Sequence, residues 1–354
     1  MTNKKIHTMA SFFSGCGGFD LGFHKNKFKI LFANDFWIPA AESFKANFPK
    51  VPFFEKPIQN IEKDELIKIV SKNSVDVFIG GPPCQCFTRL NNRHLIKLSE
   101  LKKEDERRIL SQEYIKKVKL LKPKIVLMEN VRDMLVRKNQ EGRLYKEIIE
   151  EEFKKIGYAT FYKIIDMDKY GVPQKRRRVI FFATNVKKLI KKMKENMNYG
   201  FPKEENKVSI VKEALAQLKN QKNLKNHIIT INEPETLLRI KHIPKGGYYE
   251  HLPDNLKTQK IRNGKKVIVK RYGSYFRRLN PDEPATTITN NYIIHPNKNR
   301  YLTNREKAII HTFPLRFKFC GSENDVSQQI ANAVPPLFAQ KMAKRIKEIL
   351  ENDC

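Results

Sequence analysis

The sequence predicts an α/β protein with a doubly wound, Rossmann-like sheet and a second, smaller, irregular domain. Over the first half of the chain, short apolar runs alternate with amphipathic stretches, which is the pattern of βαβ units. This alternation fades after Lys187. The 354 residues, 40% of them hydrophobic, are enough for two domains with cores.

The elements follow from these apolar patterns. Buried strands are predicted at residues 9–13, 30–33, 75–79, 125–128 and 179–183. Helices are predicted at residues 40–48, 112–121 and 144–156, and helical spacing of apolar residues predicts a last helix at 337–350. Such an order favours a largely parallel sheet covered by helices.

A domain boundary is predicted at about residues 185–200. Five lysines crowd the helical stretch that begins at Lys187, and the next hundred residues hold Gly246-Gly247, several prolines and short mixed strands such as 266–272. We therefore expect a first domain up to about residue 190 and a second, irregular domain at residues 195–300.

The charge of the chain indicates a polyanionic partner. Its formal net charge is +31 and its pI is about 9.8. Such a charge attracts nucleic acid, because bound phosphates release counterions. The alternative is that the lysines reflect the base composition of the genome and form a solvated face.

No apolar run reaches the roughly 18 residues of a membrane span, and the first ten residues lack a signal-peptide core, so we expect a cytoplasmic protein.

Cysteine usage leaves room for a reactive thiol. The five cysteines are odd in number and scattered, and Cys84 with Cys86 has no second pair at zinc-site spacing. Neither a disulfide framework nor a metal site is therefore predicted.

A glycine-rich turn follows the first predicted strand. Ser14-Gly15-Cys16-Gly17-Gly18 precedes a predicted helix, so its backbone can approach a ligand closely. Asp20 stands where a dinucleotide fingerprint has its third glycine, which argues against NAD. Asp35 ends the second strand, where a carboxylate accepts hydrogen bonds from ribose hydroxyls, and Phe36 can stack on adenine. An adenosine ligand and a purely structural turn remain the two alternatives.

Two further motifs end predicted strands. Pro82-Pro83-Cys84-Gln85 follows the strand at 75–79, and a cysteine on a rigid turn at the ligand edge suits a thiolate nucleophile better than an inert core residue. Glu129-Asn130 ends the strand at 125–128. The alternative for Glu129 is a solvated strand end.

A fourth group of polar residues stands at a strand entrance. Gln174, Arg176 and Arg178 alternate there, which predicts a shared face carrying a carboxamide and two guanidiniums. The alternative is a solvated charge run.

In order and spacing, these strings resemble the motifs of the cytosine-5 DNA methyltransferase family of bacterial restriction-modification systems, over almost the whole chain. The glycine turn from Phe13, Pro83-Cys84-Gln85, Glu129-Asn130-Val131 and the Gln-x-Arg-x-Arg string from Gln174 each match one motif. Further matches are Arg300-Tyr301-Leu302-Thr303 and Gln329-Ile330-Ala331-Asn332-Ala333-Val334-Pro335, and Thr286-Thr287 resembles a Thr-Leu-type element. The Lys56-Pro57-Ile58 stretch departs from the family, which often has an aspartate there for the adenine amino group.

The resemblance implies a Rossmann-like S-adenosylmethionine-dependent methyltransferase that acts on a flipped-out cytosine in duplex DNA. It also implies that residues 1–190 with the returning segment 325–354 form a catalytic and cofactor-binding domain, that residues 195–300 form a target-recognition domain, and that 300–325 form a connecting segment. No obligate protein partner is evident in the sequence, so we expect a monomer. The implied catalytic residues are Cys84, Glu129, Arg176 and Arg178. The implied cofactor-binding residues are Phe13, Gly15, Gly17, Gly18, Asp35, Phe36 and Asn332. The implied substrate-binding residues are Pro83, Gln85, Asn130, Gln174, Thr286 and Thr287.

Two other functions remain open at this point. One is a transfer-RNA cytosine-5 methyltransferase of the same fold, because residues 83–89 are similar to the motif of that branch, although its second Cys-Phe-Thr string is absent from the variable region. The other is a nucleic-acid-binding module without catalysis, which the intact Cys84, Glu129 and Arg178 disfavour.

Overall fold

The computed structural model describes residues 6–354 except 72, 83–97, 140, 222, 230–232, 263, 270–275 and 291, and it describes residues 98–109 as helix without their side chains. The chain forms two compact units. The first unit comprises the chain up to Asp166, then Arg177–Glu204 and Ala333–Cys354. The second unit comprises Met167–Arg176 and Glu205–Asn332.

A seven-stranded sheet in the order β3-β2-β1-β4-β5-β8-β6 forms the centre of the first unit. Its strands are β1 Thr8–Phe12, β2 Lys29–Asn34, β3 Phe53–Phe54, β4 Val77–Gly80, β5 Ile125–Val131, β6 Ala159–Asp166 and β8 Arg177–Thr184. The strands from β3 to β5 are parallel, and β8 runs antiparallel to both of its neighbours. Each of the five predicted strands overlaps one of these, and the sheet is largely parallel as predicted.

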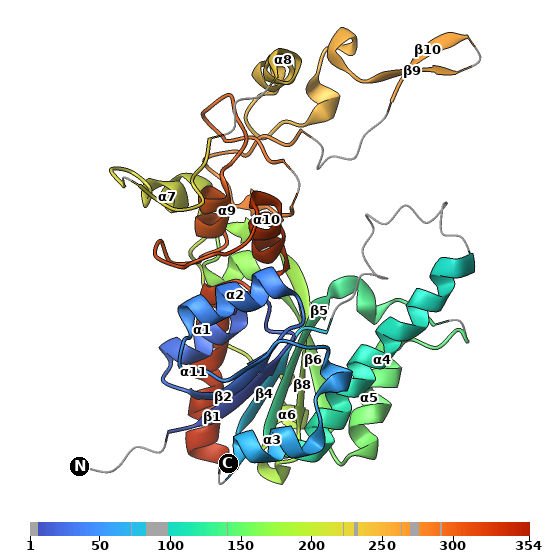
Figure 1. Ribbon diagram of the computed structural model, residues 1–354, viewed down its shortest axis with the longest axis vertical. Helices are drawn as coiled ribbons and strands as arrows, with labels where there is room; N and C mark the ends of the chain where they lie inside the picture. The colour runs from blue at the N-terminus through green and yellow to red at the C-terminus, as the bar shows by residue number, and fades with distance from the viewer. Residues whose placement is uncertain are drawn as a thin grey trace. The chain divides into compact units, whose positions relative to one another are not determined.

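Helices cover both faces of this sheet. Figure 1 shows α1 (Gly18–Lys25), α2 (Ile38–Asn47) and α11 (Pro336–Asp353) on one face, and α3 (Lys63–Val70), α4 (Leu98–Leu121) and α5 (Tyr145–Lys155) on the other. Leu66, Val118 and Phe153, from the last three helices, share one buried cluster with strand residues. The doubly wound prediction is confirmed.

The first and last helices of the first unit, α1 and α11, pack closely against each other. A Cβ atom built on Gly22 of α1 would lie 2.3 Å from the backbone of Ala339 in α11, so only glycine permits this approach. Lysine-rich α6 (Lys187–Glu195) follows β8, as the crowded lysines predicted, and Lys192 pairs with Asp353 at the end of α11.

The second unit has little regular structure. It contains α7 (Val211–Ala216), α8 (Pro234–His242), α9 (Asn304–Ile310), α10 (Glu323–Asn332), a β7 (Gln174–Lys175) and β11 (Ala285–Thr286) pair, and a hairpin of β9 (Gln259–Arg262) and β10 (Lys265–Ile268). The hairpin overlaps the strand predicted at 266–272.

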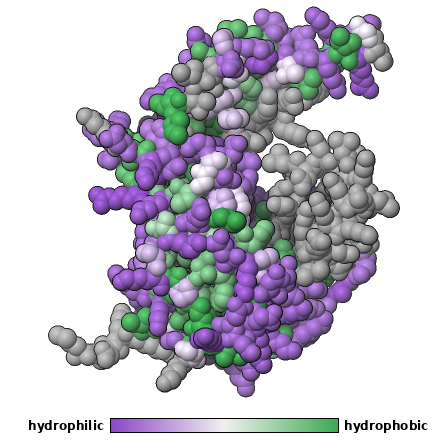
Figure 2. Space-filling view, in the orientation of Figure 1, coloured by the Kyte–Doolittle hydropathy of each residue, from purple (hydrophilic) through white to green (hydrophobic). Residues whose placement is uncertain are grey.

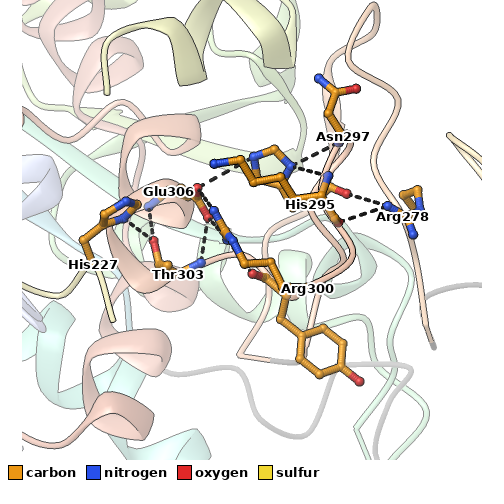
Figure 3. A network of polar contacts seen from close by, with 9 residues as sticks. His227, Arg278, His295, Asn297, Arg300, Thr303 and Glu306 are labelled. Atoms are coloured by element: carbon orange, nitrogen blue, oxygen red, sulfur yellow. Dashed lines mark hydrogen bonds and ion pairs between the residues drawn. The ribbon is translucent and has the colours of Figure 1, made fainter. Parts of the chain in front are cut away.

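Buried guanidiniums hold these irregular segments together (Figure 3). Arg278 donates to the carbonyls of Ile240 in α8, of Ile243 just after it and of His295, so one side chain ties α8 to two irregular segments. Arg300 donates both of its terminal nitrogens to Glu306, at 2.8 and 2.7 Å. Burial lowers the pKa of the neighbouring His295 to about 4, against the opposing effect of Glu306.

Candidate functional site

The predicted site residues of the first unit converge on one edge of its sheet. The strand order reverses between β1 and β4, and ligands of doubly wound sheets bind at the carboxyl ends of the strands beside such a switch point. The glycine turn follows β1, Asp35 follows β2, and Glu129 lies near the end of β5. Because β8 is antiparallel, its first residues, with Arg178 opposite Val131, reach the same edge.

The glycine turn is tight and leaves space beside it. Phe13, Gly15 and Gly17 all have positive φ, at 53°, 55° and 92°. A Cβ atom on Gly17 would lie 2.7 Å from Phe48, whereas nothing lies within 4 Å of one built on Gly15. Gly17 therefore permits close packing underneath, and Gly15 borders open space, as a ligand cradle requires. Gly18 is the first residue of α1.

Asp35 ties this turn to the end of β2. Its Oδ2 accepts the Gly15 N–H at 2.8 Å, and its Oδ1 accepts the Trp37 N–H at 3.0 Å. Burial raises the pKa of Asp35, and the backbone N–H groups partly offset that rise. Each oxygen keeps a lone pair for a hydroxyl donor. The adjacent Phe36 ring is 59% exposed and free to stack on a planar ligand.

A second carboxyl group lies beneath the same turn and was not predicted as a site residue. Asp20, in the first turn of α1, is fully buried, and burial raises its pKa to about 7. The Asp35 charge raises the pKa further, whereas the nearby Ser11 hydroxyl lowers it. From the sequence, Asp20 was used only as evidence against a dinucleotide fingerprint.

Glu129 and Arg178 form an ion pair at the sheet edge. Glu129 Oε1 lies 3.0 Å from Arg178 Nε, and the two side chains are only 12% and 16% exposed. They come from neighbouring strands β5 and β8. A Cβ atom on Gly81 would lie 3.4 Å from Glu129 Oε2, so the glycine after β4 keeps this carboxylate uncrowded. The pair offers an acceptor and a cationic donor to a small polar ring.

Asn130 fixes the start of the turn that follows β4. Its side-chain nitrogen donates to the Pro82 carbonyl at 3.2 Å, and its oxygen accepts the Val131 N–H at 2.8 Å. The buried carboxamide thereby joins the ends of β4 and β5. The next three predicted site residues, Pro83, Cys84 and Gln85, lie outside the described residues.

The Gln174 to Arg178 string alternates in exposure as predicted, because Gln174 and Arg176 are buried while Lys175 and Arg177 are exposed. The alternative interpretation of this string as a solvated charge run is therefore wrong. The string is divided between the units, since Gln174 and Arg176 belong to the second and Arg178 to the first.

Within the second unit, Gln174 joins two segments. Its Oε1 accepts the Ile288 N–H, and its Nε2 lies 2.9 Å from His311 Nδ1. Thr286 is exposed in β11, and the Thr287 hydroxyl donates to the Lys175 carbonyl at 2.8 Å.

Asn332 ends α10 in the second unit, where its Oδ1 accepts a hydrogen bond from Gln328 Nε2 at 2.6 Å. That bond leaves the side-chain amide of Asn332 to donate elsewhere.

Among the described residues, no three His, Cys, Asp or Glu side chains are grouped to hold a metal ion. No helix in the described part of the chain is long and apolar enough to cross a membrane.

Comparison with known proteins gives a match over nearly the whole chain. Residues 7–348 match the family described as C-5 cytosine-specific DNA methylase. The type II methyltransferase M1.HphI of Haemophilus parahaemolyticus is 29% identical, over 98% of this chain and 88% of that protein. The putative type II methyltransferase M.MJ0563P of Methanocaldococcus jannaschii is 31% identical, over 96% and 98%.

A third relative is the type II methyltransferase M.DdeI of Desulfomicrobium norvegicum, 30% identical over 96% of this chain and 88% of that protein. Among solved structures, a putative DNA modification methyltransferase encoded within an E. coli prophage has a TM-score of 0.75. It is 20% identical and covers 98% of this chain and 100% of that chain, which shows a shared fold.

Proposed function

Because the chain belongs to the C-5 cytosine-specific DNA methylase family, we propose that Cys84 is the nucleophile with which it methylates carbon 5 of cytosine. The chain is an S-adenosylmethionine-dependent DNA cytosine-5 methyltransferase. This assignment favours DNA methylation over the transfer-RNA and non-catalytic alternatives. The observation that supports the proposal for the site is that Pro82, directly before the Pro83-Cys84-Gln85 string, is bonded to Asn130, next to the Glu129–Arg178 ion pair at the sheet edge.

The residues of the first unit fit the cofactor. An adenosine ribose needs an acceptor for two hydroxyls, which Asp35 offers, and a backbone that can be approached closely, which the space beside Gly15 allows. Phe13, Gly17 and Gly18 would complete the cradle, and Phe36 would stack on the adenine. Asn332, which belongs to the second unit, is proposed as a further cofactor-binding residue. When bound, S-adenosylmethionine supplies an electrophilic methyl group.

Catalysis must first make carbon 5 electron-rich, because it is a poor nucleophile in an aromatic ring. The Cys84 thiolate adds to carbon 6, and the electron pair of the 5,6 double bond becomes available at carbon 5. Arg176 supports the thiolate form electrostatically. Once carbon 5 carries the methyl group, loss of its proton to water and β-elimination of Cys84 restore the ring.

The ion pair of Glu129 and Arg178 stabilises this addition. Glu129 accepts from the exocyclic amine and holds the proton at N3, so that negative charge does not build up on the ring. Arg178 donates to O2 of the same base. Their contact at 3.0 Å holds both groups together at one sheet edge and restricts their orientation before the base arrives.

The target cytosine must leave the helix to reach these groups, at an unstacking cost of a few kcal/mol. Pro83, Gln85, Asn130 and Gln174 would position the flipped base or the turn beside it, and Thr286 and Thr287 would contact the DNA. Residues 195–300 would select the sequence.

The relatives are named type II methyltransferases, which supports the modification half of a restriction-modification system. We expect a monomer in the cytoplasm.

Trapping tests the nucleophile. Duplex DNA carrying 5-fluorocytosine cannot lose a proton from carbon 5, so with cofactor the wild-type chain should form a complex that survives denaturation. Cys84→Ala should form none, whereas Cys354→Ala, at an exposed cysteine, serves as the matched control and should trap normally. A complex that persists in Cys84→Ala would remove Cys84 from this role. Methyl transfer to transfer RNA but not to duplex DNA would overturn the substrate.

A further inference from the structure

The β9–β10 hairpin stands apart from every other strand of the second unit. Its two strands pair only with each other, Lys265 opposite Arg262 and Lys266 opposite Ile261, and Figure 1 shows them at the end of an extended arm. All four residues of β9 and the first three of β10 are exposed. Ile261 is 75% exposed and Val267 is 41% exposed.

The register gives the hairpin two different faces. Residues directly opposite each other in an antiparallel pair lie on the same face, and successive residues alternate. The first face, named here the cationic face, consists of Lys260, Arg262, Lys265 and Val267. The second face, named the mixed face, consists of Gln259, Ile261, Lys266 and Ile268.

Within the part of the chain that the structure describes, carboxylates do not neutralise the cationic face. Lys257, just before β9, pairs with Asp254 at 3.0 Å. Lys260, Arg262 and Lys265 pair with no acidic side chain among the described residues. Three such charges on a ribbon two strands wide repel one another. A bound anion would offset this repulsion.

We propose that the β9–β10 hairpin enters the major groove of the target duplex with its cationic face toward the base edges. This inference rests on the proposed function and deepens it. The major groove, about 12 Å wide, admits a two-stranded ribbon, and a lone hairpin is only marginally stable until it packs against something. A second copy of the chain would bring like charges together, so it does not complement this face.

The side chains of the cationic face match what the groove displays. Arginine and lysine donate to the O6 and N7 acceptors of guanine, and the Val267 side chain can contact a thymine methyl group. Lys266, on the opposite face, points away from the bases and can only attract phosphates through long-range electrostatics. The hairpin is therefore the segment of the second unit that would read sequence.

Two adjacent lysines provide a matched test. Lys265→Ala and Lys266→Ala remove the same side chain and the same charge, one from each face. On duplex DNA carrying the methylated sequence, Lys265→Ala should weaken binding by roughly five- to 150-fold and relax the choice of one base pair, read by bisulfite sequencing. Lys266→Ala should stay within about threefold of wild type.

Equal losses in both variants, or a larger loss in Lys266→Ala, would overturn the facial assignment. No loss in either would overturn groove entry altogether. As a second variant, residues 259–268 are replaced by a short Gly-Ser turn, which should leave thermal unfolding and cofactor binding unchanged because the strands are exposed. Methylation by that variant should lose its sequence preference, and an unchanged preference would refute the proposal.

The wild-type chain separates this inference from the proposed function. If wild type traps on 5-fluorocytosine DNA and the hairpin variants keep its full selectivity, only the role of the hairpin is wrong. If wild type neither traps nor methylates duplex DNA, the proposed function itself is wrong.

Discussion

Replacing Asp35 by alanine is expected to weaken S-adenosylmethionine binding, because it removes the acceptor proposed for the ribose hydroxyls. The variant removes the carboxylate that accepts the Gly15 and Trp37 N–H groups at 2.8 and 3.0 Å, and with it the acceptor for the ribose. Hydrogen bonds to charged groups contribute about 1.5–3 kcal/mol. We take one such contribution for the ribose, which corresponds to a roughly 10- to 150-fold rise in Kd.

Titration calorimetry with the cofactor measures this change directly. Asp35→Asn keeps one acceptor oxygen and should fall between wild type and Asp35→Ala. Asp64→Ala removes an exposed carboxylate from the first turn of α3 and is the matched control, with unchanged affinity. Unfolding by urea tells whether the turn itself has loosened. Equal cofactor affinity in wild type and Asp35→Ala would refute the placement of the ribose.

Three further variants test the fold around the site. Because burial raises the pKa of Asp20 to about 7 from 3.8, the folded chain holds a proton that the unfolded chain has lost, so its free energy of unfolding falls as pH rises between these values. Urea unfolding of Asp20→Asn should lack this decline, which is at most about 4 kcal/mol, and identical pH profiles would contradict it. Gly22→Ala places a Cβ atom 2.3 Å from the α11 backbone and should destabilise the first unit by about 1–3 kcal/mol. The urea midpoint should fall accordingly. An unchanged midpoint would show that α1 and α11 can move apart without loss of stability. Gln174→Met removes the acceptor of the buried Ile288 N–H and the amide that contacts His311, and should lower the free energy of unfolding by about 1–3 kcal/mol. A variant as stable as wild type would show that these two contacts of Gln174 do not stabilise the second unit.

Elements with continuous apolar runs were predictable, and elements without them were not. β5 and β8 are buried almost throughout and were predicted to within a few residues. β6 was missed, because it lies at the edge of the sheet and all but one of its residues are partly or fully exposed. α3 was missed as well, although Glu62 and Glu65 form a capping box at its start.

The candidate site shows the same division between local and long-range information. Motif strings predicted that Asp35, Glu129 and Arg178 belong to one site, and the parallel strands explain why the first two lie at the same edge of the sheet. The hydrogen bond from Asn130 to Pro82 joins residues 48 positions apart, and no local pattern contains it. The hairpin could have been predicted, because the Asn263-Gly264 pair between short mixed strands is a strong turn signal.

The contact between α1 and α11 has a consequence for synthesis on the ribosome. One face of the sheet is covered by helices from both ends of the chain, and residues 205–332 of the second unit are made before Pro336–Asp353. Chains usually fold as they emerge, domain by domain. Here the nascent first unit must wait, with α1 lacking its partner helix at Gly22, until the second unit has been translated. Chaperone demand and the risk of aggregation should therefore peak late in translation, after the catalytic motifs have already been made.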